Sequence, residues 1–273
     1  MYPRLGGFEN LDGALLYTPV TALAALAVSL VLFWLLGREG FRIRDLVPMA
    51  VLVGIGGFGG AKLYSLLYRW VSFGGTLGDF SQEVQGGWRY PGALVGMLLA
   101  VWLGRRLLPR GLSARAYLDA WAPAFAFGGG IGRVACLLHG CCYGAPTSLP
   151  WAIQYPYGSI PWHDHLSAGH ISRVESLSAA VHPFPVYLLL MEWILAVYLL
   201  RLRKRARFEG EVTLHFLAIH GLAKGWLELF RDPVSGFHLV VVPIGLVALA
   251  VLLWERRLSF ADERAGAAGV GVS

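Results

Sequence analysis

The stretch that decides the fold is Gly128-Gly-Gly-Ile-Gly-Arg133-Val-Ala-Cys136-Leu-Leu-His139-Gly-Cys141-Cys142-Tyr-Gly144. Its first half ends an apolar run long enough to cross a bilayer, and its second half begins a loop. An arginine inside such a run costs roughly 2.5–3.5 kcal/mol on insertion. Arg133 therefore indicates a functional site, and the surrounding apolar runs indicate the scaffold that holds it.

The whole chain has the composition of an integral membrane protein. Apolar residues make up 56% of its 273 residues and charged residues only 15%, against about 25% in soluble domains. The net charge of +6 comes from short Lys and Arg clusters between apolar runs, so we predict no nucleic acid partner. The odd count of three cysteines predicts no extended disulfide framework.

Seven apolar runs are candidates for membrane-spanning helices, since about 20 apolar residues cross a bilayer. They cover residues 15–36, 46–67, 91–103, 118–138, 184–200, 212–230 and 237–254. The connections alternate in basic content, with 15 Lys and Arg in one set and five in the other. The chain is thus predicted to be an all-α integral membrane protein with seven transmembrane helices, the N-terminus outside and the C-terminus cytoplasmic.

The domain organisation follows from the same runs. We expect a single membrane domain over residues 1–260, in which residues 139–183 form an outer-face loop or head segment. Residues 261–273 are small and polar and are predicted to be a disordered cytoplasmic tail. Aromatic residues in the head segment are expected at the level of the lipid headgroups: they are Trp151, Tyr155, Tyr157 and Trp162.

Three cations remain inside the predicted spans: Lys62, Arg133 and Lys224. Each lies about five to seven residues from the outer end of its helix, roughly 8–10 Å below the surface. A shared depth predicts one site, with Glu192 and Glu228 as carboxylate partners. The alternative is that these charges only pair with one another or extend to the surface, although paired intramembrane charges usually also mark a substrate path.

The sixth run places four polar residues on one side of a helix. His220, Lys224, Glu228 and Arg231 follow one another at steps of four, four and three, so they form one stripe. A polar seam between two helices would show the same spacing. The glycine run that ends at Gly132 similarly allows two interpretations, a cradle for an anion or a packing surface between helices.

A cationic pocket at this depth is placed to hold a phospholipid phosphate, because the headgroup boundary is where lipid phosphates lie. Arginine offers paired planar donors to phosphate and lysine a point charge. His139 with Cys141 and Cys142, or the run His163-Asp164-His165, could bind a metal, but neither spacing matches a standard zinc pattern. We therefore predict no metal and no cofactor.

Several motifs together resemble one family. They are Asp119-Ala-Trp-Ala-Pro123, Gly128 to Arg133, Gly140 and Gly144-Ala-Pro-Thr-Ser-Leu-Pro-Trp151, with Gly60-Ala-Lys-Leu-Tyr64, His182-Pro183, Tyr187, Glu192 and Glu228-Leu-Phe-Arg231-Asp-Pro233. The first four resemble the signature region of the prolipoprotein diacylglyceryl transferases. The others occur in the order that this family shows, and the seven-span arrangement is similar too.

The resemblance implies a function. The family transfers the diacylglyceryl group of phosphatidylglycerol to the thiol of a lipobox cysteine in the signal peptide of a preprolipoprotein, and releases glycerol phosphate. It implies a multi-pass protein of the bacterial plasma (inner) membrane whose active site faces the outer leaflet. The resemblance places the family's essential arginine at Arg133, the following glycine at Gly144 and the sixth-span glutamate at Glu228.

Five positions depart from the family pattern. The third-span histidine is replaced by Pro91, the second arginine by Lys224, a tyrosine by His220, an asparagine by Cys136 and a glutamate by Cys141. These departures allow two alternatives to the family's reaction. The first is transfer of a lipid-derived group to a different acceptor, and the second is a non-catalytic phospholipid-binding or transport protein, although the internal repeats usual in transporters are not evident.

The predicted site residues take three roles. Arg133 and Lys224 would hold the phosphate and stabilise charge on the leaving oxygen. His220 or His139 would accept the thiol proton, because the thiolate is the nucleophile, and Glu228 would orient Lys224 or the histidine. The headgroup site comprises Arg133, Lys224, Lys62, Gly144, Arg231 and Gly132.

Overall fold

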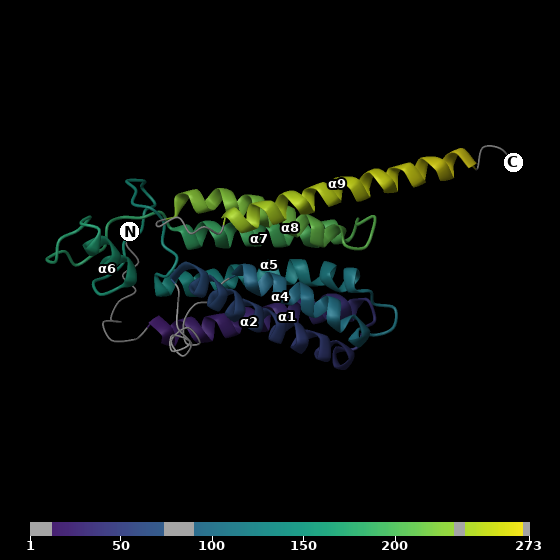
Figure 1. Cartoon of the computed structure of the whole chain (residues 1–273), viewed down its shortest axis with the longest axis horizontal. Coiled ribbons are helices and arrows are strands. Elements are labelled where there is room, and N and C mark those ends of the chain that lie inside the picture. The colour runs from purple at the N-terminus through teal and green to yellow at the C-terminus, as the bar shows by residue number, and fades with distance from the viewer. Residues whose placement is uncertain (1–12, 74–89, 232–237, 270–273) are drawn as a thin grey trace. The chain divides into compact units, whose positions relative to one another are not determined.

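The protein is built from helices. The computed structural model describes residues 13–73, 90–231 and 238–269, and within these ranges it contains helices and isolated β-bridges but no strand (Figure 1). Five helical segments are long and apolar enough to cross a membrane: Tyr17–Arg38, Ile43–Leu67, Ala114–His139, Phe184–Arg203 and Leu239–Ser259. The prediction of an all-α, multi-pass membrane protein is confirmed.

Each of the seven predicted runs contains a helix. In order, the helices are α1 (Gly13–Arg38), α2 (Ile43–Phe73), α4 (Tyr90–Leu103), η2 (Gly104–Leu107), α5 (Ala114–His139), α6 (Ile160–Ser167), α7 (Phe184–Arg203), α8 (Glu211–Leu227), η3 (Glu228–Phe230) and α9 (His238–Gly269). With 14 and 17 residues, α4 and α8 are shorter than a membrane span usually is.

The C-terminal tail differs from the prediction. Residues 261–273 are predicted to be disordered, but α9 continues to Gly269. Part of the physical reason is the four alanines of this segment, together with Glu263 and Arg264, because these residue types are strong helix formers. The N-terminus and residues 270–273 lie outside the described residues.

The chain divides into two compact units, residues 32–120 and a second unit of residues 1–31 with 121–273. In the first unit α2 packs against α4 through facing glycines, Gly56 and Gly60 on α2 and Gly92 and Gly96 on α4. A Cβ atom on Gly56 would lie 2.6 Å from the carbonyl oxygen of Gly96. These positions must therefore be glycine for the two backbones to approach so closely. That residues 1–260 form a single membrane domain stays a prediction.

In the second unit α8 packs against both α7 and α9, and Figure 1 shows these three helices side by side. Gly221 allows the close approach, because a Cβ atom there would lie 2.5 Å from the carbonyl oxygen of Val241. At the other end of α8 the buried carboxylate of Glu211 accepts a hydrogen bond from Arg256 on α9 at 2.8 Å. The same guanidinium lies 3.3 Å from His215 Nε2. This ionic contact ties α8 to α9.

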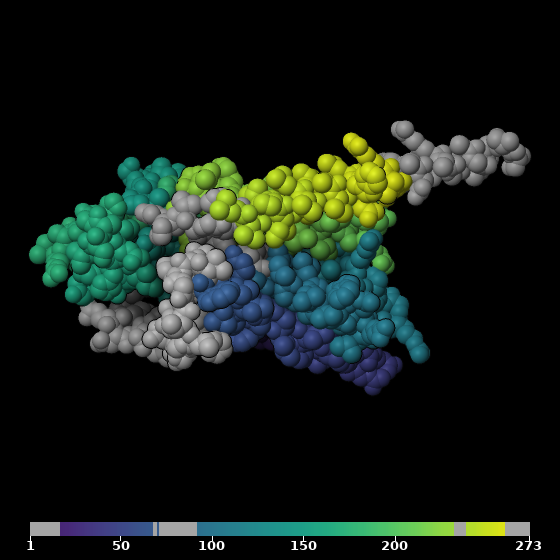
Figure 2. All heavy atoms as spheres, viewed as in Figure 1, coloured from purple at the N-terminus to yellow at the C-terminus, as the bar shows by residue number. Residues whose placement is uncertain are grey.

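The head segment, residues 140–183, has a small core of its own, and Figure 2 shows it as a teal-to-green lobe. Tyr143, Tyr155 and Val181 form this core. Trp162 is also buried and donates to the backbone carbonyl of Glu175 at 2.9 Å. Tyr155 and Trp162 thus pack inside the head segment, while Trp151 and Tyr157 are exposed, and the expected position of the four residues at the lipid headgroups stays a prediction.

Candidate functional site

The second unit brings two of the predicted cations together. Arg133 lies six residues before the end of α5, and Lys224 lies in the last turn of α8. The two side chains are close enough to interact electrostatically, and Lys224 is only 3% exposed. Lys62 is half-buried on α2, which belongs to the other unit, so its membership of this site stays a prediction.

Buried carboxylates accompany these cations. Glu192 on α7 lies 3.2 Å from Nδ1 of His220, and both side chains are almost fully buried. Glu192 also interacts electrostatically with Arg133 and Lys224. Pro185 lies in the first turn of α7, where the backbone N–H that proline lacks would have no partner within the helix. The helix can therefore begin at Phe184, which places Glu192 about two turns inside it.

The predicted polar stripe of the sixth run is largely buried. α8 ends at Leu227, and Glu228 opens the short helix η3 that follows. Glu228 is buried and interacts with Lys224, and its Oε1 lies 3.6 Å from Nη1 of Arg231. The break in the helix turns Arg231 toward the same carboxylate, and Arg231 is more exposed than the rest of the stripe.

The charges of this cluster do not cancel. Counting these five side chains alone, without the neighbouring Cys142, the three positive charges of Arg133, Lys224 and Arg231 exceed the two negative charges of Glu192 and Glu228 by one when His220 is neutral. A buried cluster with unbalanced charge attracts a counter-ion, because the low dielectric strengthens the interaction.

The glycine run before Arg133 packs against neighbouring helices. A Cβ atom on Gly128 would lie 2.7 Å from the carbonyl oxygen of Ala24 on α1, and Gly130 meets the indole of Trp193 on α7. Gly132 also faces Ala24, at 3.8 Å. These contacts favour the packing interpretation of the run over the anion cradle.

Gly144 forms a junction of three backbone segments. Its N–H donates to the carbonyl of His182, and the next N–H, of Ala145, donates to the carbonyl of Phe230 at 2.8 Å. A Cβ atom on Gly144 would lie 2.6 Å from His182 Cβ and 2.7 Å from the Phe230 oxygen. The glycine thus lets the head segment pair with Arg231, with which Gly144 forms an isolated bridge.

His139, the last residue of α5, contacts Tyr17 of α1 through tilted rings with centroids 5.3 Å apart. Tyr17 in turn lies in electrostatic range of Arg133 and of the three cysteines. The geometry therefore places His139 beside the cluster, on the side that α1 covers.

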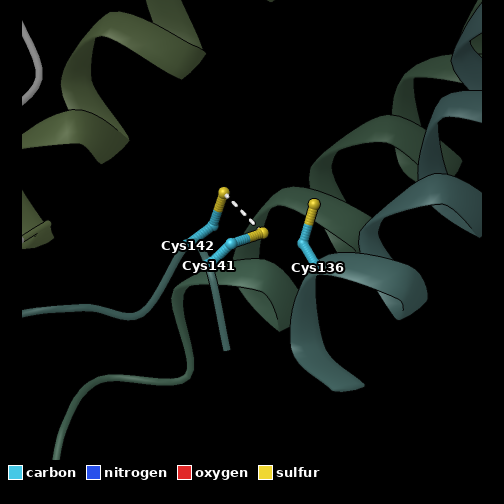
Figure 3. A group of neighbouring side chains, drawn as sticks. All are labelled: Cys136, Cys141 and Cys142. Atoms are coloured by element: carbon cyan, nitrogen blue, oxygen red, sulfur yellow. Dashed lines mark hydrogen bonds between the residues drawn. The ribbon is translucent and has the colours of Figure 1, made fainter. Parts of the chain in front are cut away.

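The three cysteines lie together because of the turn that ends α5. Gly140 has the left-handed φ of 72°, and its N–H donates to the carbonyl of Cys136 at 2.9 Å. The turn folds Cys141 and Cys142 back over Cys136, as Figure 3 shows. The thiol of Cys141 donates to the sulfur of Cys142 at 3.8 Å.

The charged cluster influences the nearest cysteine. The pKa of the Cys142 thiol lies well below its ordinary value, because hydrogen bonds from Cys136 and Cys141 stabilise the thiolate and the guanidiniums of Arg133 and Arg231 attract it. The pKa of Cys141 is raised, since its hydrogen bonds to the same two cysteines and its burial favour the neutral thiol.

The sequence prediction named Glu192 as a charge partner of the cations but gave it no catalytic or headgroup-binding role. It also omitted Tyr17 and the cysteines. An acidic residue within an apolar run was a usable signal for Glu192. Tyr17 gave no such signal, because a tyrosine near a helix end is common at membrane boundaries.

Fold and site together define a multi-pass membrane protein with a buried cationic cluster suited to an anionic headgroup. The model of one family, prolipoprotein diacylglyceryl transferase, matches residues 15–254. The chain belongs to this family, as its motifs suggested, and is therefore of the transferase class.

Individual relatives agree with the family model. The chain is 28% identical to the phosphatidylglycerol–prolipoprotein diacylglyceryl transferase of Clostridium tetani, over 80% of this chain and 81% of the relative. It is also 28% identical to the protein of the same name from Chromohalobacter salexigens, over 85% of this chain and 84% of the relative. The similarity thus covers more than four fifths of each relative.

Proposed function

We propose that the protein transfers the diacylglyceryl group of phosphatidylglycerol to the lipobox cysteine thiol of a preprolipoprotein. The observation that carries the proposal is the cluster of Arg133, Lys224 and Arg231, whose three cationic groups outnumber the neighbouring carboxylates of Glu192 and Glu228. Phosphatidylglycerol presents one phosphodiester charge near the membrane surface, which is opposite in sign to that excess. Family membership and the names of the relatives support the same donor and acceptor.

The membrane arrangement that suits this function has seven spans, with α4 and α8 as the two short ones. We place the N-terminus and head segment outside and the C-terminus in the cytoplasm, in the bacterial inner membrane. The distribution of Lys and Arg between alternate connections supports this orientation. The cluster then lies below the outer leaflet's headgroups, where phosphatidylglycerol and the signal peptide of an exported protein can both reach it.

The reaction is a displacement at carbon. The acceptor sulfur forms a bond to the glyceryl carbon, the bond from that carbon to the phosphate oxygen breaks, and glycerol phosphate leaves with one additional negative charge. Arg133 and Lys224 hold the phosphate and stabilise this charge in a site of low dielectric. Glu228 contacts Arg231 at 3.6 Å and interacts with Lys224, so it orients the cations.

His220 accepts the thiol proton in this mechanism, with His139 as the second candidate. The carboxylate of Glu192, 3.2 Å from His220, would stabilise the imidazolium that forms. A buried carboxylate beside a buried histidine makes the same contribution in other acid–base pairs, where it fixes the orientation of the ring. Glu192 therefore acts through His220 and is a positioning residue.

The direct test supplies purified protein with labelled phosphatidylglycerol and a lipobox peptide, and looks for a thioether-linked diacylglyceryl product. Arg133→Ala should abolish transfer while the protein stays folded in detergent. Glu192→Gln should lower kcat by roughly 100-fold with little change in KM, since general base catalysis contributes about 10²–10⁴-fold. Full activity of Arg133→Ala would refute the phosphate role, and lipid consumption without peptide labelling would indicate another acceptor.

A further inference from the structure

Three thiols converge at the end of α5. The ligand atoms of Cys136, Cys141 and Cys142 all lie within 4.8 Å of one another, and Figure 3 shows their sulfur atoms gathered between the helix and the loop that follows it. Cys136 is buried, and the other two are half-buried. Among the described residues, this is the one group of three or more His, Cys, Asp or Glu whose ligand atoms lie so close together.

The spacing of one pair of sulfurs matches the edge of a metal site, and the other two pairs lie within 4.8 Å. A zinc ion binds sulfur at about 2.3 Å, so two sulfurs on a tetrahedral zinc are about 3.8 Å apart. The Cys141 and Cys142 sulfurs are 3.8 Å apart. A disulfide would need about 2.05 Å, so the observed arrangement is close to metal geometry and far from a covalent bond.

We propose that Cys136, Cys141 and Cys142 bind a Zn²⁺ ion whose fourth coordination position accepts the thiolate of the acceptor cysteine. Sequence spacing alone predicted no metal, because it did not bring Cys136 to the other two. Structural zinc sites are closed by four protein ligands, whereas catalytic ones have three and keep one position open. A site with three cysteine ligands therefore resembles a catalytic zinc site, which keeps one coordination position open.

The position of the group suits this role. Cys142 lies in electrostatic range of Arg133, Arg231 and Lys224, the cations proposed to hold the phosphate. A thiolate bound at the zinc would stand beside the phospholipid whose carbon it attacks. Two of the ligands, Cys136 and Cys141, also stand where the family resemblance predicts an asparagine and a glutamate, and a third family residue, the histidine, is replaced by Pro91.

A zinc ion would deprotonate the acceptor thiol, a step for which the third-span histidine of the family is absent here. A thiol that coordinates zinc loses its proton, and the thiolate is the nucleophile. In the step proposed, the acceptor S–H bond breaks and its proton goes to His220 or to solvent. The zinc-bound sulfur then forms its bond to the glyceryl carbon as the carbon–oxygen bond to phosphate breaks, and no electrons are exchanged with any other reagent. This second half of the inference depends on the proposed transferase function.

The metal half is tested by the zinc content of the purified, reduced protein after dialysis against zinc and gel filtration. We expect about one zinc per chain. Loss of a residue that only hydrogen-bonds a metal ligand weakens metal binding roughly 10- to 100-fold. Loss of a ligand itself should weaken zinc binding by more than that in each of the variants Cys136→Ser, Cys141→Ser and Cys142→Ser. His163→Ala is the matched control, an exposed head histidine outside the group that should keep its zinc. Absence of zinc, or a Cys141–Cys142 disulfide in the active protein, would refute the site.

The acceptor half is tested with cobalt, whose absorption bands report thiolate coordination. Co²⁺ replaces zinc in the full-length protein, and a lipobox peptide is added with its cysteine intact or replaced by serine. The cysteine peptide should change the bands and the serine peptide should not. Equal spectra with both peptides would refute thiolate binding at the metal. Transfer at full rate by the metal-free triple serine variant would refute the role of zinc in transfer while leaving the transferase function standing. Zinc binding without transfer would refute the transferase function and the acceptor half, and would leave only the metal site.

Discussion

The replacement of Lys224 by methionine tests the charge argument directly. Methionine keeps the length and apolar stem of the buried lysine but removes its charge, so the cluster of three cations and two carboxylates becomes neutral. At about 4 Å from a phosphate, one unit charge contributes about 4 kcal/mol at an effective dielectric constant of about 20. The affinity for phosphatidylglycerol should then fall roughly 1,000-fold, since about 1.4 kcal/mol corresponds to tenfold.

A second substitution separates charge from folding. Lys224→Met leaves Glu228 with less compensation, which by itself can cost about 3–5 kcal/mol of stability. The double variant Lys224→Met, Glu228→Gln restores the net positive charge, and it frees Arg231 from its carboxylate. We expect it to recover stability and at least about tenfold of the lost affinity, while transfer stays impaired.

The assay measures binding of labelled phosphatidylglycerol in detergent together with the melting temperature of each variant. Lys224→Arg is the control that keeps the charge, and it should bind the lipid. Wild-type affinity in Lys224→Met, in protein that melts normally, would show that the cluster does not bind the phosphate through its charge.

Two further predictions concern the scaffold. Gly144→Ala brings a Cβ atom to 2.6–2.7 Å from His182 and Phe230, so it should lower stability by about 1–3 kcal/mol and reduce transfer. Gly54→Ala is the control, because a Cβ atom there has open space around it, and it should change neither stability nor transfer. Thermal melts and the transfer assay measure both effects. Arg256→Ala removes the ionic partner of the buried Glu211 carboxylate, which keeps a hydrogen bond from the backbone N–H of Arg207. It should cost about 1–3 kcal/mol in a denaturation experiment, and an unchanged stability would contradict the ionic contact.

The apolar runs predicted the helices well, because a bilayer imposes the length and composition of any segment that crosses it. The four-residue periodicity of the sixth run similarly predicted that His220 and Lys224 share one side of α8. The end of α9 was missed, since a small, polar composition does not distinguish a solvated helix from a disordered tail. The end of α8 at Leu227 was missed as well, because the chain continues directly into η3 with helical backbone angles at Glu228.

The rest of the site depends on contacts between distant segments. Nothing near Glu192 in the sequence indicates that it meets His220, since the two lie on different helices. The meeting of Cys136 with Cys142 depends on the left-handed conformation of Gly140, and a glycine in a sequence allows that conformation without requiring it. Such features are properties of the fold, and periodicity along the chain does not record them.

The junction at Gly144 has a mechanical consequence. Backbone hydrogen bonds fasten the head segment to His182, just before α7, and to Phe230, one residue before Arg231. A movement of the head segment relative to α7 would therefore also displace the backbone next to Arg231. Under the proposed function, a signal peptide that binds at the head segment would thereby change the position of Arg231, so the two substrate sites would be coupled through the backbone.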